Sequence, residues 1–210
     1  MTSTEPAHQD PVVHIVDDDE DLRQSLVFLL ESVGIQALSY PDATSFLDEF
    51  DADEPAVVIL DIRMPEMSGF QLQERLLSDG YPAPVIFCSA HGDIPMSVRA
   101  LKHGAVDFLE KPYQTQRMLE VVQKHLLEAR ERFAEHAGRR EITRRIDTLT
   151  EREREVLRLV IDGLSSQLIA RRLEMSVKTV DVHRARIKSK TGSETLGALV
   201  RDVLLHRITV

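Results

Sequence analysis

The chain contains 210 residues, of which 42% are hydrophobic and 29% are charged. This composition is ordinary for globular domains, and the length is sufficient for two of them. No apolar run approaches the roughly 20 residues that span a membrane, and the N-terminus lacks the basic-then-apolar pattern of a signal peptide. We therefore expect a cytoplasmic protein that does not bind membranes. A single cysteine, Cys88, excludes an internal disulfide and a multi-cysteine metal site.

Charge is distributed unevenly along the chain, although the whole carries a formal net charge of −9. Residues 1–125 contain 8 Lys and Arg against 22 Asp and Glu, whereas residues 126–210 contain 18 against 13. Clustered Lys and Arg gain affinity for nucleic acids by releasing condensed counterions. The imbalance indicates either an acidic domain followed by one that binds nucleic acid, or solvated surfaces that differ by chance.

The first half alternates short apolar segments with segments of helical spacing. Apolar runs predict strands at Val12–Val16, Ile35–Ser39, Val57–Leu60, Val85–Ser89 and Val106–Leu109. Helical spacing predicts helices at Leu22–Val33, Ala43–Phe50, Phe70–Ser78, Pro95–His103 and Tyr113–Leu127. Strands that are apolar throughout are typical of parallel sheets covered by helices on both faces. The sequence therefore predicts an α/β doubly wound, flavodoxin-like domain with a parallel five-stranded sheet.

Polar side chains stand at the carboxyl ends of these predicted strands. Asp17 and Asp18 follow the first strand and Asp61 follows the third, and these strands are neighbours in the flavodoxin-like order. Ser89 and Lys111 follow the fourth and fifth strands. Clustered carboxylates favour an oxygen-ligated cation such as Mg²⁺, and a hydroxyl and an ammonium beside them suit a phosphoryl group. We therefore interpret Asp61 as a nucleophile that accepts a phosphoryl group.

Helical spacing continues beyond the fifth predicted helix. The apolar residues that repeat there at intervals of three and four are Leu119, Val122, Leu126, Ala129 and Phe133. This seam would either pair with a second copy of the chain or pack against the chain's own domains. We expect Gly138 to interrupt the helix, and residues 139–146 to form a charged connector.

The C-terminal part is predicted to form helices joined by short turns. The expected helices with their caps are Glu151–Ile161 after Thr150, Gln167–Leu173 after Ser165 or Ser166, and Val177–Thr191 after Ser176. A three-residue turn joins the last two helices, and the small Ala170 lets them cross closely. This pattern predicts an all-α helix-turn-helix domain whose second helix enters the major groove of DNA.

Four segments of the first half resemble the receiver domains of two-component response regulators of the FixJ subgroup: VHIVDDDED, LDIRMPEMSG, FCSAHGD and GAVDFLEKP. The resemblance covers Val12 to about Leu127. It implies that Asp61 is the phosphoacceptor. It also implies a metal site for Mg²⁺ or Mn²⁺, with the ligands Asp17, Asp18, Asp61 and the backbone carbonyl of Arg63.

The same resemblance assigns the residues that respond to phosphorylation. Ser89 and Lys111 would contact the phosphoryl group, and Ser89 and Phe108 would form the conformational switch. Pro112 would follow a cis peptide bond, where an ordinary turn would have a trans bond. Phosphorylation would promote a homodimer through the fourth helix, fifth strand and fifth helix, and the fourth helix carries Val98, Arg99 and Lys102.

The segment LTEREREVLRLVIDGLSSQLIARRLEMSVKTVDVHRARIKSKTG closely resembles the LuxR-type DNA-binding domain. Val180 and Ile187 fit the inward face of its recognition helix, so Asp181, Val182 and Ala185 should face the bases. The residues expected to contact DNA through bases or phosphates are Lys178, Thr179, Asp181, Val182, Arg184, Ala185, Arg186, Lys188 and Lys190. Asp181 replaces the lysine common in the wider LuxR group, although acidic residues occur there in the FixJ subgroup. The operator therefore cannot be carried over.

Together these features predict a DNA-binding transcriptional response regulator of a two-component phosphorelay. The expected parts are a receiver at 11–127, a helical linker at 128–147 and a LuxR-type helix-turn-helix domain at 148–210. The expected partners are a cognate sensor histidine kinase, double-stranded DNA, RNA polymerase and a second copy of the chain. We do not expect an enzyme beyond Mg²⁺-dependent self-phosphorylation from small donors and slow autodephosphorylation.

Two other classes fit parts of the pattern. Hydrolases that form a phosphoaspartate also use an aspartate at a strand end with Mg²⁺, but they need a second aspartate two residues later, where this chain has Arg63. A protein-binding module that has lost DNA binding would be consistent with the acidic Asp181. The intact basic residues around Asp181 argue against that interpretation.

Overall fold

The computed structural model describes residues 10–90 and 94–210, so His91–Asp93 of the FCSAHGD segment lie outside the described residues. The chain divides into two compact units, Met1–Ala134 and Glu135–Val210, and each is described by itself. Within the described residues, no helix is long and apolar enough to cross a membrane.

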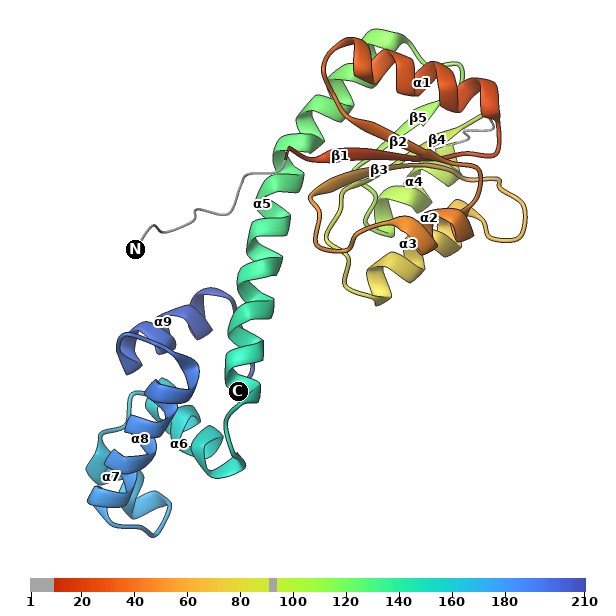
Figure 1. The fold of residues 1–210 in the computed structure, drawn as a ribbon. Coiled ribbons are helices and arrows are strands. Elements are labelled where there is room, and N and C mark those ends of the chain that lie inside the picture. Colours follow the sequence, from red (N-terminus) through yellow and green to blue (C-terminus); the bar gives the residue numbers. More distant parts are fainter. Residues whose placement is uncertain (1–9, 91–93) are drawn as a thin grey trace. The chain divides into compact units, whose positions relative to one another are not determined.

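The first unit is built on a parallel sheet with the strand order β2-β1-β3-β4-β5 (Figure 1). Its strands are β1 (Val12–Val16), β2 (Ala37–Tyr40), β3 (Ala56–Asp61), β4 (Val85–Ser89) and β5 (Asp107–Glu110). All residues of β1, β3 and β4 are buried, which confirms the interpretation of apolar runs as central strands covered on both faces. The flavodoxin-like fold is therefore confirmed.

Helices cover both faces of this sheet (Figure 1). They are α1 (Glu20–Ser32), α2 (Ala43–Glu49), α3 (Gly69–Ser78), α4 (Ile94–Lys102) and the first part of α5 (Thr115–Asp147). Leu30 of α1 and Met118 of α5 are fully buried in the core on one face. Phe46 of α2 and Leu72 of α3 are fully buried in the core on the other. The carboxyl ends of the strands therefore remain uncovered by the helices that pack on the faces.

α5 is longer than the sequence indicated. The expected interruption at Gly138 is wrong. The helix has 33 residues and continues through Gly138 to Asp147. One glycine costs a helix only about 1 kcal/mol relative to alanine. A Cβ on Gly138 would lie 2.8 Å from Cε1 of His206, so within the second unit a larger residue at this position would require the His206 ring to move.

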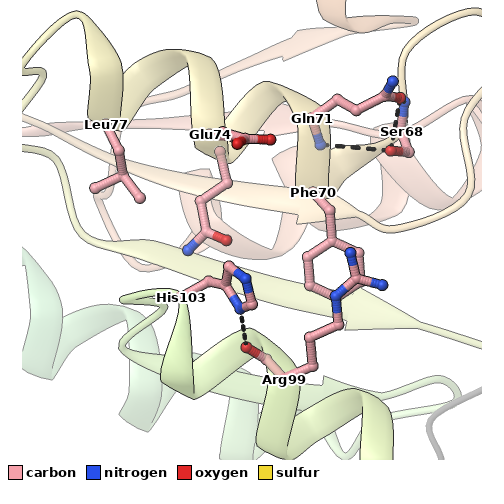
Figure 2. A pocket seen from close by; sticks show the side chains of 8 residues that line it. Ser68, Phe70, Gln71, Glu74, Leu77, Arg99 and His103 are labelled. Atoms are coloured by element: carbon pink, nitrogen blue, oxygen red, sulfur yellow. Dashed lines mark hydrogen bonds between the residues drawn. The ribbon is translucent and has the colours of Figure 1, made fainter.

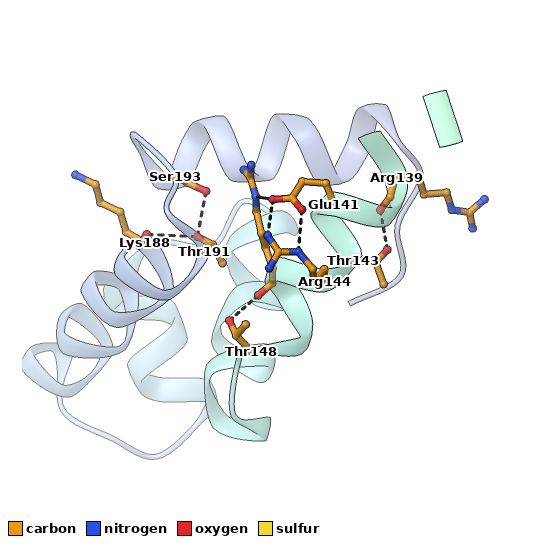
Figure 3. Close-up of polar contacts among 9 residues, drawn as sticks. Arg139, Glu141, Thr143, Arg144, Thr148, Lys188, Thr191 and Ser193 are labelled. Carbon is orange, nitrogen blue, oxygen red and sulfur yellow. Dashed lines mark hydrogen bonds and ion pairs between the residues drawn. The ribbon is translucent and has the colours of Figure 1, made fainter. Parts of the chain in front are cut away.

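Ion pairs on the exposed face of α5 support the helix beyond Gly138. Glu141 accepts hydrogen bonds from Arg144 at 2.8 and 2.9 Å, as Figure 3 shows, and another from Arg145 at 2.8 Å. The hydrogen bonds from Arg144 and Arg145 lower the pKa of Glu141 to about 2. Pairs three and four residues apart stabilise a helix modestly.

The second unit consists of the end of α5 followed by α6 (Glu151–Ile161), α7 (Ser166–Arg172), α8 (Val177–Thr191) and α9 (Leu196–Leu205). Thr150, Ser165 and Ser176 cap α6, α7 and α8, which confirms the expected starts of α6 and α8 and decides between the two serines before α7, a helix that begins at Ser166, one residue earlier than expected. α9, for which no range was predicted, contributes the buried Leu199 and Val203 to the core.

An ion pair between the buried Glu153 and the exposed Lys190 joins α8 to the start of α6. Glu153 forms a capping box with Thr150, and its Oε2 also accepts a hydrogen bond from Nζ of Lys190 at 2.7 Å. The Glu153 side chain is only 3% exposed. Burial would raise the pKa of this carboxyl, but the hydrogen bonds from Lys190 and Thr150 outweigh burial and hold the pKa below its ordinary value.

Replacing Glu153 with Gln should therefore destabilise the second unit at neutral pH, by about 1–3 kcal/mol for a lost charge-assisted hydrogen bond. A carboxyl with a depressed folded pKa contributes stability above its unfolded pKa of about 4.3 and loses it as the pH falls through the folded value. The difference in the free energy of unfolding between the wild type and Glu153→Gln should shrink as the pH falls from the unfolded pKa of Glu153 through its folded pKa. Amide hydrogen exchange in α6 and α8, compared between the two proteins at each pH, measures this difference.

Glu155, whose side chain is 36% exposed and pairs with the exposed Arg152, provides the matched control because ion pairs at the surface contribute little. Glu155→Gln should leave exchange in α6 and α8 almost unchanged at every pH. Equal protection in wild type and Glu153→Gln at pH 7 would contradict this account of the ion pair.

Candidate phosphoacceptor site and nucleic-acid interface

The carboxyl ends of β1, β3 and β5 converge on one ammonium group. Nζ of Lys111, just after β5, donates hydrogen bonds to Oδ2 of Asp17 at 2.6 Å and to Oδ1 of Asp61 at 2.7 Å. The three side chains are 12%, 4% and 9% exposed, so the charges are largely screened from water. The structure thus brings together three of the residues that the sequence predicted to share a site.

Backbone groups hold the two carboxylates in place. The N–H of Arg63 donates to Oδ2 of Asp61 at 2.6 Å, and the N–H of Asp19 donates to Oδ1 of Asp17 at 3.1 Å. Asp19 itself caps α1 by accepting a hydrogen bond from the N–H of Leu22 at 3.1 Å. Each of the two carboxylates therefore has one oxygen fixed by the main chain and the other bound to Lys111.

Burial and the ion pairs act in opposite directions on these groups. Burial raises the pKa of the Asp61 carboxyl, while the hydrogen bonds from Lys111 and Arg63 lower it, and the net direction is upward. Burial lowers the pKa of Lys111, but the carboxylates of Asp17 and Asp61 outweigh burial and raise it. The ammonium charge is therefore stabilised by the site.

One of the metal ligands expected from the sequence, Asp18, does not join this cluster. Asp18 is exposed, and in residues 10–90 and 94–210 no three His, Cys, Asp or Glu side chains lie close enough to hold a metal ion. Lys111 stands between the two buried carboxylates instead. The expected metal ligands at this end of the sheet are nonetheless all oxygen atoms, which fits a hard cation such as Mg²⁺.

The residues expected to act as a switch lie on the two strands beyond β3, with Ser89 on β4 beside the Asp61 strand and Phe108 on β5 next to β4. Ser89 is buried at the end of β4, and its carbonyl accepts from the N–H of Lys111 at 2.8 Å. The Lys111–Pro112 peptide is cis, as the resemblance implied. Phe108 on β5 is partly buried against the core on the α3 and α4 face of the sheet.

The α4 residues expected at a dimer interface are exposed. Val98 is 43% exposed, and Arg99 and Lys102 also face solvent. The guanidinium of Arg99 lies 4.5 Å from the ring centre of Phe70 on α3 and covers that ring, as Figure 2 shows. The pocket in Figure 2 is therefore lined jointly by α3 and α4.

Gly69 is a site residue that the sequence reasoning missed. It begins α3 directly after the capping Ser68, and its N–H donates to the carbonyl of Ile62 at 3.1 Å. A Cβ on Gly69 would lie 2.1 Å from the backbone oxygen of Asp61. The glycine after Met67 and Ser68 in MPEMSG was the available signal, because a glycine inside a helix start commonly marks close backbone approach.

The recognition helix α8 places its residues largely as expected. Val180 and Ile187 are fully buried, which confirms the inward face. The exposed residues among those expected at DNA are Lys178, Thr179, Asp181, Val182, Ala185, Arg186, Lys188 and Lys190. Arg184 is half-buried, and Lys190 also serves the ion pair with Glu153.

Asp181 has a partner that the sequence did not indicate. Its Oδ1 accepts a hydrogen bond at 2.9 Å from the hydroxyl of Ser166, at the start of α7. The same hydroxyl accepts a hydrogen bond from Nη1 of Arg184 at 3.4 Å. Two charged residues of the recognition helix therefore contact one uncharged side chain of the preceding helix.

A phosphoacceptor-like site on a flavodoxin-like sheet, followed by a helix-turn-helix unit, defines a receiver joined to a DNA-binding output domain. Family models match accordingly: the response regulator receiver domain over residues 13–123, and the luxR family of bacterial regulatory proteins over residues 147–201. The chain belongs to the two-component response regulators with a LuxR-type output domain. Phosphorylation-dependent activation is typical of this family, and receiver domains generally bind Mg²⁺ at the phosphorylation site.

Individual relatives are similar over nearly the whole chain. The transcriptional regulatory protein FixJ of Bradyrhizobium diazoefficiens is 37% identical over 90% of this chain and 92% of its own length. The structure of the response regulator StyR is 38% identical with a TM-score of 0.72, covering 94% of this chain and 100% of StyR. Full-length FixJ from B. japonicum is 34% identical with a TM-score of 0.54, covering 95% and 98%.

Adding a methyl group at Gly69 should disturb β3, the strand that carries Asp61. In Gly69→Ala, β3 or α3 must shift to relieve the contact with the Asp61 carbonyl, at a cost of about 1–3 kcal/mol in the free energy of unfolding. The rate at which acetyl phosphate labels the protein should fall as well, because Asp61 moves relative to Lys111. Thermal unfolding and intact-mass spectrometry measure the two effects.

Gly197, near the start of α9, provides the matched control. A Cβ there would meet only the hydroxyl of Thr195 at 3.9 Å, so Gly197→Ala should be neutral or stabilising by up to about 1 kcal/mol. Labelling should be unchanged in this variant. If Gly69→Ala behaves like Gly197→Ala in both thermal unfolding and labelling, the close approach of Gly69 to the Asp61 carbonyl matters neither for stability nor for phosphorylation.

Proposed function

We propose that Asp61 accepts a phosphoryl group from a cognate sensor histidine kinase and that this modification controls DNA binding by α8. The observation that carries the proposal is the position of the Lys111 ammonium between the Asp17 and Asp61 carboxylates at 2.6 and 2.7 Å. A buried carboxylate with a cation at hydrogen-bond distance supports transfer of a group that carries several anionic oxygens.

The transfer itself is a displacement at phosphorus. A carboxylate oxygen of Asp61 forms the new P–O bond as the bond between phosphorus and the donor's imidazole nitrogen breaks, and the imidazole leaves with a proton from solvent. The Lys111 ammonium then contacts phosphoryl oxygens, and the hydroxyl of Ser89 donates to another. Small donors such as acetyl phosphate would serve in place of the kinase, and slow autodephosphorylation would reverse the modification.

We propose that Asp17, Asp18, Asp61 and the Arg63 carbonyl hold Mg²⁺ or Mn²⁺ during this transfer. The oxygen-only donors at the strand ends support this ligand set. When bound, the ion supplies positive charge against the phosphoryl oxygens. Lys111 would then release Asp17 and keep its contact with the modified Asp61.

The proposed output is a dimer on paired DNA half-sites. Phosphorylation would pull Ser89 toward the phosphoryl group, let Phe108 fill the vacated space and change the α4, β5 and α5 surface. The exposed Val98, Arg99 and Lys102 support that surface as the dimer contact. We also propose the domain limits 11–127, 128–147 and 148–210, and contact of the bound dimer with RNA polymerase.

Replacing Asp61 with Asn tests the proposal directly. The wild-type protein, treated with acetyl phosphate and Mg²⁺, should gain about 80 Da in intact-mass spectrometry, the mass of one phosphoryl group replacing a proton. It should also bind duplex DNA more tightly in a gel shift. Asp61→Asn should show neither change, because an amide cannot form the anhydride.

Asp48, an exposed aspartate on α2, provides the control. Asp48→Asn should be labelled and should bind DNA like the wild type. Undiminished labelling of Asp61→Asn would overturn the assignment of the phosphoacceptor. Labelling of the wild type with no change in DNA binding would overturn the proposed control of the output domain.

A further inference from the structure

Ser166 is placed so that its hydroxyl can act outside its own helix. The preceding residue, Ser165, is the N-cap of α7, and its hydroxyl accepts from the N–H of Leu168 at 3.4 Å. Capping is therefore supplied without Ser166. The hydroxyl of Ser166 instead reaches α8, where it donates to Oδ1 of Asp181 at 2.9 Å, across a sequence separation of 15 residues.

This hydroxyl lies between two opposite charges of the recognition helix. Asp181 and Arg184 are three residues apart on α8 and therefore share one side of that helix. Ser166 donates to the carboxylate and accepts from Nη1 of the guanidinium at 3.4 Å. Asp181 is exposed and Arg184 half-buried, which is consistent with the guanidinium lying back against α7 while the carboxylate stays accessible.

The position of the hydroxyl relative to α8 is set by buried contacts between the two helices. Ile169 and Ala170 of α7 are 0% and 4% exposed, and Val180 of α8 is 0% exposed. The three residues belong to one core cluster. This packing fixes where α7 crosses α8, and it therefore fixes the position of Ser166. The longer side chains of Asp181 and Arg184 form hydrogen bonds with the Ser166 hydroxyl at that position.

We propose that Ser166 is a specificity-determining positioning residue, which sets the base preference of α8 by orienting Asp181. This inference rests on the proposed DNA binding by α8. With Oδ1 held by Ser166, Oδ2 of Asp181 remains to accept from an exocyclic amino group, such as that of cytosine, in the major groove. The same hydroxyl keeps Arg184 beside α7, so this guanidinium contributes less to phosphate contacts than the exposed Arg186.

The test selects binding sites from a randomised duplex DNA pool with the full-length protein phosphorylated by acetyl phosphate. The wild type, Ser166→Ala, Ser166→Thr, Asp181→Ala and the double variant Ser166→Ala with Asp181→Ala are compared by sequencing the selected pools. Ser189→Ala is the matched control, because Ser189 is an exposed serine on α8 itself. Thermal unfolding confirms that each variant is folded.

Asp181→Ala identifies the base position that Asp181 reads. At that position, Ser166→Ala should lower discrimination roughly three- to tenfold, the scale of one net hydrogen bond. The double variant should discriminate no worse there than Asp181→Ala alone, because Ser166 acts through Asp181. Ser166→Thr, which keeps a hydroxyl, and Ser189→Ala should retain the wild-type preference.

The possible results distinguish a failure of the positioning role of Ser166 from a failure of the proposed DNA binding by α8. If Asp181→Ala changes a base preference and Ser166→Ala does not, the positioning role is overturned while DNA binding by α8 stands. If Ser166→Ala weakens binding to every sequence equally, Ser166 is merely structural and the inference is also wrong. If the phosphorylated wild type enriches no sequence, the proposed function fails and the inference fails with it.

Discussion

The ammonium of Lys111 between two buried carboxylates is the contact on which the first unit depends. It joins the ends of β1, β3 and β5 through hydrogen bonds of 2.6 and 2.7 Å in a place that water reaches poorly. Removing one partner from such a group leaves a buried charge without compensation, which costs about 3–5 kcal/mol. The site is therefore stable only while its charges balance.

That balance explains why a phosphoryl group would have effects beyond Asp61. A new group with roughly two negative charges must be compensated, and the Lys111 ammonium already contacts both carboxylates of the site. The backbone N–H of Lys111 is bonded to the Ser89 carbonyl, and β5 also carries Phe108 in the core beside α3 and α4. A shift of Lys111 is thus mechanically connected to the α4 surface where Arg99 covers Phe70.

Much of the fold and site was predictable because it follows from local rules. Parallel strands end on the same edge, so Asp17, Asp61 and Lys111 could be placed together from their positions after apolar runs. The caps Thr150 and Ser176 follow from the preference of helix N-termini for hydroxyl side chains. The buried Val180 and Ile187 follow from the spacing of seven residues, which returns to the same side of a helix.

The features that were not predicted depend on contacts between different helices and strands, and the spacing of residues along the sequence does not reveal such contacts. The hydrogen bond from Ser166 to Asp181 requires the crossing of α7 over α8, and the closeness of the His206 ring to Gly138 requires α9 to end beside α5. Gly69 is needed only because α3 begins against the carbonyl of Asp61. Lys190, expected at DNA from its charge, is also the partner of the buried Glu153.

One comparison tests most directly the proposal that phosphorylation of Asp61, with Lys111 at the phosphoryl oxygens, controls DNA binding by α8. The affinity of the full-length protein for duplex DNA is measured before and after acetyl phosphate treatment, in the wild type and in Lys111→Ala, with mass spectrometry reporting the phosphorylated fraction. At equal phosphorylation, the wild type should gain affinity and Lys111→Ala should gain little or none. An equal gain in both proteins would contradict the account.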